Sequence, residues 1–210
     1  MRDQPFHHGN LRADLLDRAE RTLREGGIEE LSLRELARQA GVSHGAPRSH
    51  FADRQALLDA LAERGFARMT DDLIAAIASE PRDFGRCLRA VARGYVRFAV
   101  TDAALLDLMF AAKVADPPEA VRTAAERLFS TFGALMDAGH ASGLLRTEDL
   151  FRTKLLFAAT MQGIASLIAS RRISAEQGDE LVLDSTATWI RSIDEADVET
   201  AHRFTAPTAP

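Results

Sequence analysis

Apolar residues recur at intervals of three and four along most of the chain, and this periodicity is the strongest constraint on its fold. Leu11, Leu15, Ala19 and Leu23 are one example, because these four side chains would line a single face of a helix. No stretch alternates apolar and polar residues, and no Asn-Gly or Asp-Gly hairpin turn occurs. The sequence therefore predicts an all-α protein of about nine helices.

Capping residues and helix breakers indicate where these helices begin and end. Ser32 with Glu35, and Ser174 with Gln177, have the spacing of a capping box, in which two side chains satisfy the free N–H groups of a first turn. Gly41 supplies a left-handed residue that ends the second helix. Further N-caps are expected at Asn10, Asp53, Asp102, Asp116 and Thr147. The expected helices cover approximately residues 10–25, 32–40, 44–51, 54–78, 83–100, 103–114, 117–143, 148–169 and 174–193.

The segment from Ser32 to Phe51 has the pattern of a helix-turn-helix. Two short helices joined by a turn that contains glycine can cross steeply, so that the second helix projects into a major groove of DNA. Pro47 fits the first turn of that second helix, where its missing N–H would have no partner in any case. Phe51 is expected to pack beneath the helix as part of the core. The alternative is an ordinary pair of packed helices in which Gly41 is only a C-cap.

The charge distribution is compatible with DNA binding, although the chain as a whole is acidic. Residues 1–51 contain eight arginines and eight acidic residues, so the remainder carries the whole net charge of −5. Locally placed arginines on such a neutral segment can still bind phosphates. We expect weak non-specific binding that is sensitive to salt.

Several other classes of protein are disfavoured. Cys87 is the single cysteine, which excludes an intrachain disulfide and a thiolate zinc site; it is expected to be a small buried hydrophobic residue, with a redox sensor as the alternative. No Ser-His-Asp arrangement, glycine-rich phosphate loop or helix-borne metal pair suggests an enzyme, a metal site or a cofactor. There is no stretch long and apolar enough to cross a bilayer and no signal peptide, so a cytoplasmic protein is expected.

Five ordered segments closely resemble the N-terminal domain of TetR-family transcription regulators: His7–Arg12, Leu33–Ala37, Gly41–Pro47, His50–Phe51 and Leu57–Leu58. Tyr95–Ala99 and Leu108–Phe110 are similar to the branch whose C-terminal domain is named for a Trp-His-Gly signature, which reads Met161-Gln162-Gly163 in this chain. The resemblance implies a helix-turn-helix domain over residues 1–53 and an effector-binding and dimerisation domain over residues 54–194. Residues 54–78 would be the connecting helix and residues 195–210 a flexible tail.

The resemblance also implies which residues touch DNA. Arg48 stands where the family usually has a tyrosine that contacts the phosphate backbone; an arginine can bind phosphate with two hydrogen bonds or read guanine. Arg54 keeps the charge of the family's usual lysine. His44 and Ser49 are candidates for base contacts. The full set of expected DNA-binding residues is Ser32, Arg34, Ser43, His44, Gly45, Arg48, Ser49, His50 and Arg54.

Aromatic residues and methionines gather in the second domain, where they form either a plain helical core or an apolar ligand pocket between helices. Gln162 lies on a mostly apolar helix, so it needs a hydrogen-bond partner or serves as a polar handle for a ligand. The candidate ligand-binding residues are Tyr95, Phe98, Met109, Phe110, Phe129, Phe132, Phe157, Met161 and Gln162.

The last two expected helices are candidates for a homodimer interface, because the resemblance implies a four-helix contact there. Gly163 and Ser166 allow close approach of helices, whereas Trp189 fits the core and the interface equally well. The candidate interface residues are Gly163, Ser166, Leu167, Leu181, Val182 and Trp189.

These features predict a dimer that binds double-stranded DNA and responds to a small apolar effector. We expect a repressor that leaves a palindromic operator when the effector binds. A shift of residues 54–78 would change the spacing between the two helix-turn-helix domains of the dimer, which we call the reading heads. The alternatives are a transcriptional activator and a ligand-binding bundle that has lost DNA binding.

Overall fold

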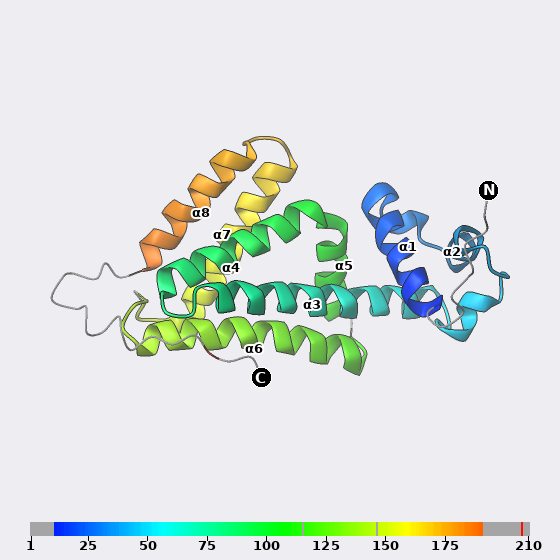
Figure 1. Cartoon of the computed structure of the whole chain (residues 1–210), viewed down its shortest axis with the longest axis horizontal. Helices are drawn as coiled ribbons and strands as arrows, with labels where there is room; N and C mark the ends of the chain where they lie inside the picture. Colours follow the sequence, from blue (N-terminus) through cyan, green and yellow to red (C-terminus); the bar gives the residue numbers. More distant parts are fainter. Residues whose placement is uncertain (1–10, 115, 146, 191–206, 208–210) are drawn as a thin grey trace. The chain divides into compact units, whose positions relative to one another are not determined.

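The computed structural model describes residues 11–114, 116–145, 147–190 and 207 (Figure 1). This part of the chain contains eight α-helices and two short 3-10 helices. The helices are α1 (Leu11–Gly26), η1 (Ile28–Glu30), α2 (Leu33–Ala40), η2 (Ala46–Ser49), α3 (Arg54–Ser79), α4 (Phe84–Thr101), α5 (Ala103–Val114), α6 (Glu119–Ala141), α7 (Leu150–Ala169) and α8 (Ala175–Trp189). The all-α fold class predicted from the apolar periodicity is confirmed.

Two compact units make up the chain, and each is described by itself. The first contains the described residues up to Phe66 together with Asp102–Thr123. Its core is formed by leucines of α1 and α2, by Phe51 and by the first half of α3, with Leu15, Leu36, Leu57 and Leu61 fully buried. It therefore combines the helix-turn-helix segment with α5.

The second unit contains Ala67–Thr101 and the described residues from Ala124 onward. In it α4 packs against both α7 and α8, and these two helices also pack against each other. Its core contains Phe84, Leu88, Leu135 and Met161, each of which has at most 2 % of its surface exposed. An isolated antiparallel bridge joins Leu145 to Ile190 at the end of α8.

Most expected helix ends are close to the observed ones, and the second and last helices begin as predicted. Ser32 accepts a hydrogen bond from the Glu35 N–H at 3.2 Å, although the Glu35 carboxylate binds Arg38 and Gln39 instead of completing a capping box. Ser174 and Gln177 form the full reciprocal box. The expected end of the last helix near residue 193 and the expected tail lie outside the described residues, apart from Pro207.

Three expectations were wrong in detail. Asp116, which was expected to cap a helix beginning at Pro117, has a left-handed φ of 52°, and α6 begins at Glu119. The third helix, expected over residues 44–51, is only the 3-10 helix η2, because Gly45 favours a turn and Pro47 lacks the N–H that a longer helix would use. The helix expected to start after Thr147 begins at Leu150, where Asp149 accepts the Arg152 N–H at 3.0 Å. The Thr147 hydroxyl instead accepts the N–H of Asp149 itself.

Candidate nucleic-acid interface and ligand-binding region

The turn between α2 and η2 is built as the sequence predicts. Gly41 adopts the left-handed conformation (φ 66°, ψ 27°), which a residue with a Cβ adopts only at a cost. The following N–H, of Val42, then bonds back to the Ala37 carbonyl at 3.0 Å, so the chain leaves α2 sharply. This turn brings the next segment round so that its polar side chains are presented on the surface.

An apolar base supports η2 from below. Phe51 is 2 % exposed, which confirms its assignment to the core, and Pro47 is also buried. The guanidinium carbon of Arg12 lies 5.5 Å from the centre of the Phe51 ring, a cation–π contact that ties α1 to the end of the motif. With the apolar residues turned inward, the polar residues of the same short segment face solvent.

All nine residues that the sequence analysis assigned to DNA contact have exposed side chains or, for Gly45, an exposed backbone. Arg34 and Arg48 form no ion pair within the part of the chain that the structure describes. No acidic residue occurs between Val42 and Ala52. The surface of Ser43–His50 is therefore locally basic even though the whole chain carries a net charge of −5.

Three of these nine residues are partly engaged within the protein, among them Ser32, whose hydroxyl accepts the Glu35 N–H. Arg54 donates hydrogen bonds from Nε to the Leu31 carbonyl (2.9 Å) and from Nη2 to the Ile28 carbonyl (2.5 Å). The Ser49 hydroxyl donates to the Ala46 carbonyl at 2.7 Å, so toward DNA this oxygen is available as an acceptor only. Arg54 thus stabilises the end of η1, a role that no sequence pattern indicates.

Arg38, which is not among the expected DNA-binding residues, is paired within the protein. Its guanidinium binds both carboxylate oxygens of Glu35, at 2.8 and 2.5 Å. These hydrogen bonds, followed by one from Gln39, lower the pKa of Glu35 to about 2. The pair therefore stays ionised and mutually neutralised, and Arg38 contributes less to the basic surface than Arg34 does.

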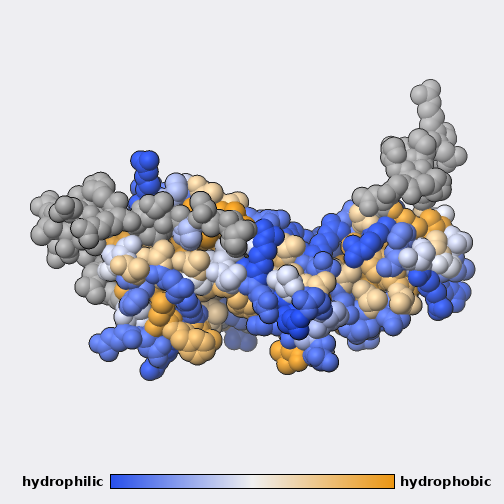
Figure 2. Space-filling model, turned by 90° about the horizontal axis from the view of Figure 1, so that it is seen from below, coloured by the Kyte–Doolittle hydropathy of each residue, from blue (hydrophilic) through white to orange (hydrophobic). Residues whose placement is uncertain are grey.

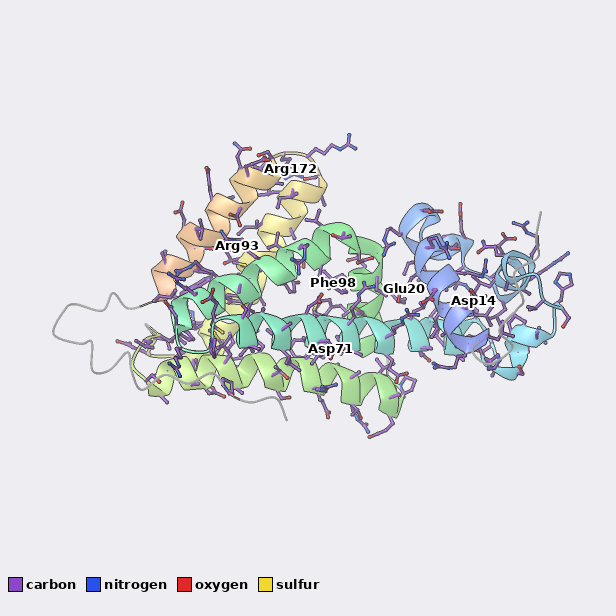
Figure 3. All side chains as sticks on the ribbon, viewed as in Figure 1. Asp14, Glu20, Asp71, Arg93, Phe98 and Arg172 are labelled. Carbon is purple, nitrogen blue, oxygen red and sulfur yellow. The ribbon has the colours of Figure 1, made fainter. Side chains whose placement is uncertain are left out.

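Ion pairs within the first unit join α1 to α3 and to Asp102, the residue that precedes α5. Arg24 donates two hydrogen bonds to Asp102, and Arg64 binds the carboxylates of Asp17 (2.5 Å) and Glu20 (3.0 Å). Glu20 lies on α1, where Figure 3 labels it. These ion pairs join helices that are far apart in the sequence.

Two residues expected to bind ligand belong to this first unit. Met109 is fully buried close to Gly65 of α3, and Phe110 makes an edge-to-face contact with Phe66 at 6.3 Å between ring centres. The other seven candidates, Tyr95, Phe98, Phe129, Phe132, Phe157, Met161 and Gln162, lie in the second unit. The structure therefore divides the expected ligand-binding set between the two units.

The Tyr95–Gln162 pair is the polar feature that stands out on an otherwise apolar part of the second unit. The Tyr95 hydroxyl donates to Oε1 of Gln162 at 2.6 Å. Gln162 is exposed, so the burial that would have made a partner necessary is not observed. Burial raises the pKa of Tyr95 to about 12, so the phenol remains a donor. Since its oxygen is occupied, the Gln162 amide presents N–H donors to a further group.

An aromatic cluster lies nearby in the same unit. The rings of Phe132 and Phe157 are 5.0 Å apart, and those of Phe157 and Trp189 are 5.6 Å apart. Phe98 is covered by the Arg68 guanidinium at 4.8 Å and is labelled in Figure 3. Trp189 is half-buried and packs against Phe157 of the second unit.

The six candidate interface residues fall into two groups. Val182 is 1 % exposed and Trp189 packs on Phe157, so both contribute to the core of the second unit. Gly163, Ser166 and Leu181 are exposed, and Leu167 is half-buried. Two leucines of α7 that the sequence analysis did not select, Leu155 and Leu156, are 55 % and 48 % exposed on the same helix as Gly163. The spacing of Leu155 and Leu156 along the chain is that of ordinary core residues, so the sequence did not mark them as surface residues.

No group of three or more metal-ligating side chains occurs among the described residues. No described helix is long and apolar enough to span a membrane. The face of the molecule drawn in Figure 2 mixes hydrophilic and hydrophobic residues.

A helix-turn-helix with a locally basic exposed face, followed by a second helical unit, defines the class of DNA-binding transcriptional regulators. Two family models match the sequence. Residues 15–61 match the bacterial regulatory proteins of the tetR family, and residues 88–193 match the tetracyclin repressor-like C-terminal domain. The chain belongs to the TetR family of transcriptional regulators, whose members bind DNA, dimerise and respond to small molecules.

Solved structures share the whole architecture. A protein of unknown function from Rhodococcus sp. RHA1 is 42% identical, with a TM-score of 0.80 over 89% of this chain and 96% of that one. A tetR-family regulatory protein from Rhodococcus RHA1 (20% identity, TM-score 0.66, 85% and 97% coverage) shows the same fold. So does a TetR-family regulator from Marinobacter aquaeolei VT8 (16% identity, TM-score 0.67, 87% and 97% coverage). No curated protein matches the sequence.

Proposed function

We propose that this regulator is a cytoplasmic repressor that binds a palindromic operator as a homodimer and is released by a small, largely apolar effector. The two reading heads would occupy successive major grooves roughly 34–36 Å apart. Ser43, His44, Arg48 and His50 would enter or border the groove, and Ser32 and Arg34 would contact phosphates. A movement of residues 54–78 on effector binding would then change the spacing of the heads.

The observation that carries this proposal is that the exposed Arg34 and Arg48 form no ion pair within the described residues, and that no acidic residue occurs between Val42 and Ala52 around Arg48. Arg38, by contrast, is paired with Glu35. Arg34 and Arg48 form no such pair in the described chain, so their full charge is available to phosphate. The neighbouring serines and histidines supply further hydrogen-bonding groups at the same surface.

Selection of bound duplexes from a random DNA pool tests the proposal directly. A selected sequence with two-fold symmetry would support both the operator and the dimer. Arg48→Ala should then weaken binding, whereas Arg127→Ala, which removes an exposed arginine from α6, should not. If no duplex is bound at low ionic strength, the DNA-binding assignment fails; if the selected sequence lacks symmetry, the dimeric mode of binding fails.

The dimer itself can be tested at Gly163, which lies exposed on α7 with no atom within 4 Å of the position that a Cβ would occupy. Gly163→Arg should therefore leave the protomer folded while placing a charge in the proposed interface. Sedimentation of the purified protein should show a monomer for this variant. Ala120→Arg on the exposed side of α6 serves as the matched control and should remain a dimer.

The effector is expected to combine an apolar body with a hydrogen-bond acceptor. The cluster of Phe132, Phe157 and Trp189 offers apolar contact, and the Gln162 amide offers the donor. Titration of the operator complex with apolar carbonyl compounds, aromatic ketones for example, would identify a compound that releases DNA. Gln162→Leu should weaken that response without changing operator affinity in its absence; an unchanged response would remove Gln162 from the site.

A further inference from the structure

One arginine side chain joins the two ends of the helix-turn-helix motif. The chain enters the motif through Leu31 and Ser32, the N-cap of α2, and leaves it through Asp53, the residue that precedes α3. Arg54, the first residue of α3, donates from Nε to the Leu31 carbonyl at 2.9 Å and from Nη2 to the Ile28 carbonyl at 2.5 Å. We call this pair of hydrogen bonds the Arg54 clamp. It connects the entry of the motif to its exit, although Arg54 and Leu31 lie 23 residues apart.

The two carbonyls that Arg54 binds belong to η1, whose last backbone acceptors have no partner within the helix itself. Leu31, the C-cap of η1, is 1 % exposed, so water has little access to its carbonyl and a donor from the protein has to satisfy it. A cation is favoured at the C-terminal end of a helix, and a charged donor forms the stronger hydrogen bonds. Loss of the clamp would therefore leave the buried Leu31 carbonyl without its Arg54 donor.

The opposite end of α2 is held in the same manner. Arg18 of α1 donates from Nη1 to the Gln39 carbonyl, in the last turn of α2, at 2.7 Å, and Asp14 accepts its Nε–H at 2.9 Å. Arginines from the two flanking helices thus bind backbone carbonyls just before α2 and at its end. The turn at Gly41 then leads from α2 directly into Ser43–His50, which we call the reading segment.

The clamp occupies donors that a phosphate contact would use. Nε and Nη2 form one of the two-pronged edges with which a guanidinium binds an anion. In Arg54 both of these atoms donate to backbone carbonyls, so only Nη1 and the second N–H of Nη2 remain. Arg34 and Arg48 form no ion pair within the described residues, and they therefore differ from Arg54 in what their guanidinium groups can offer to DNA.

We propose that Arg54 is a positioning residue of the reading head. It clamps the entry of the motif to its exit and so holds the reading segment in the orientation that a major groove requires. Arg54 thereby acts through the backbone of the motif, whereas the sequence analysis assigned it to direct contact with DNA. This inference rests on the proposed binding of an operator, but the clamp itself can be measured in the absence of DNA.

The same two substitutions at Arg54 and at Arg34 separate positioning from phosphate contact. Arg34 is exposed on α2, and we expect it to contact phosphate. Lysine keeps the positive charge but lacks the planar group that donates to two carbonyls at once. Arg54→Lys and Arg54→Met should therefore both weaken operator binding about tenfold, the effect of losing one hydrogen bond from a charged donor. Arg34→Lys should retain most of the affinity that Arg34→Met loses.

The dependence on salt and on DNA sequence is a second readout. Loss of a phosphate contact weakens specific and random duplexes alike and makes the slope of log K against log salt shallower by about 0.9. Arg34→Met should show this pattern. Arg54→Met should leave the slope unchanged and should weaken the operator complex more than the random one, because a misplaced reading segment loses base contacts. All affinities are measured at a temperature at which circular dichroism shows every variant to be folded.

The clamp has its own readout in the free protein. The Nε–H of an arginine gives a resonance in ¹⁵N NMR spectra, and donation to a carbonyl slows its exchange with water. The Nε–H of Arg54 should exchange about tenfold more slowly than that of Arg127, which is exposed on α6.

Each of the other outcomes contradicts a defined part of the proposal. Equally fast exchange at Arg54 and Arg127 would show that the clamp does not form in solution. Full operator affinity in Arg54→Lys, together with a shallower salt slope in Arg54→Met, would return Arg54 to the phosphate contacts. Parental affinity and sequence preference in both Arg54 variants would limit the clamp to the stability of the fold. A parent protein that binds no duplex would overturn the proposed function and the positioning role together, and slow exchange at Arg54 would then show that the clamp alone remains.

Discussion

Arg24, in the last turn of α1, donates hydrogen bonds from Nε and Nη2 to Oδ1 of Asp102, at 3.0 and 2.5 Å. Asp102 is the single residue between α4 and α5, and only 11 % of its side chain is exposed. These hydrogen bonds raise the pKa of Arg24 above its ordinary value. Asp102, which precedes α5 in the first unit, is thereby joined directly to α1.

A double-mutant cycle on this pair should give a coupling free energy of about 1 kcal/mol, the upper end for a pair that is partly open to solvent. The reason is that Asp102 is nearly buried, so Asp102→Ala leaves Arg24 without its main acceptor. Urea unfolding of the parent, Arg24→Ala, Asp102→Ala and the double variant measures the coupling. The Glu35–Arg38 pair on the surface of α2 is the control, and its coupling should be the smaller of the two. A coupling no larger than this control would contradict the structural role assigned to Asp102.

Gly65 and Gly94 should respond oppositely to alanine. A Cβ on Gly65 would lie 2.6 Å from Sδ and 2.9 Å from Cγ of Met109, which is fully buried and has little room to move. Gly65→Ala should therefore destabilise the protein by about 1–3 kcal/mol through overpacking.

At Gly94, in the middle of α4, a Cβ would meet nothing within 4 Å. Gly94→Ala should stabilise the protein by about 0.5–1 kcal/mol, because alanine loses less backbone entropy in a helix. Chemical denaturation of both variants provides the comparison. Unchanged stability in Gly65→Ala would show that α3 and α5 do not approach as closely as described.

Much of this fold could be predicted because its signals are local. The caps at Ser32, Asp53 and Ser174 depend on side chains within three residues of the groups they bind, and the Gly41 turn depends on one backbone conformation. The exposure of the polar residues in Ser43–His50 also has a local cause. Phe51 and Pro47 are buried beneath this segment, so its polar side chains face solvent.

Contacts between residues that are far apart in the chain could not be predicted from one sequence. Arg54 looks like any surface arginine, and only the fold brings the Leu31 and Ile28 carbonyls within its reach. Met109 and Phe110 have the composition of ligand-pocket residues, but they pack in the first unit because α5 lies against α1. An apolar stripe indicates that a helix face is buried without indicating which helix buries it.

Stability should fall as the pH rises above about 9, and Cys87 is a defined contributor. Burial, followed by the nearby charges of Asp83 and Glu80, raises the pKa of the Cys87 thiol from 9.0 to about 12. The folded thiol thus keeps its proton while the unfolded chain releases it, so the stabilisation is complete below pH 9 and is lost as the pH rises toward 12.

Between pH 9 and 10 this one group should account for a loss of about 1 kcal/mol in the free energy of unfolding. Urea titrations at pH 8, 9 and 10 on the parent and on Cys87→Ala isolate it, because the variant should lose that part of the pH dependence. Tyr95, whose pKa burial also raises to about 12, acts in the same direction from about pH 10. An identical pH dependence in the parent and Cys87→Ala would exclude the thiol as the cause.

Arg48 offers the sharpest test of how the reading segment contacts DNA. It is exposed, it lies next to the buried Pro47, and it forms no ion pair in the described chain, so its guanidinium can bind a phosphate with two hydrogen bonds. Arg48→Gln should weaken binding to specific and unrelated duplexes by a similar factor. The slope of log K against log salt should become shallower by about 0.9, the value for one lost phosphate contact.

Arg127→Gln, on the exposed side of α6, removes the same charge and should leave both the affinity and the slope unchanged. A different outcome would reassign Arg48 to base recognition. In that case Arg48→Gln would cost about 1–3 kcal/mol on the selected operator, would relax the preference at one base pair, and would leave binding to unrelated duplexes almost as strong. Competition with operators substituted at each position in turn distinguishes the two, because only a base contact makes the loss depend on sequence.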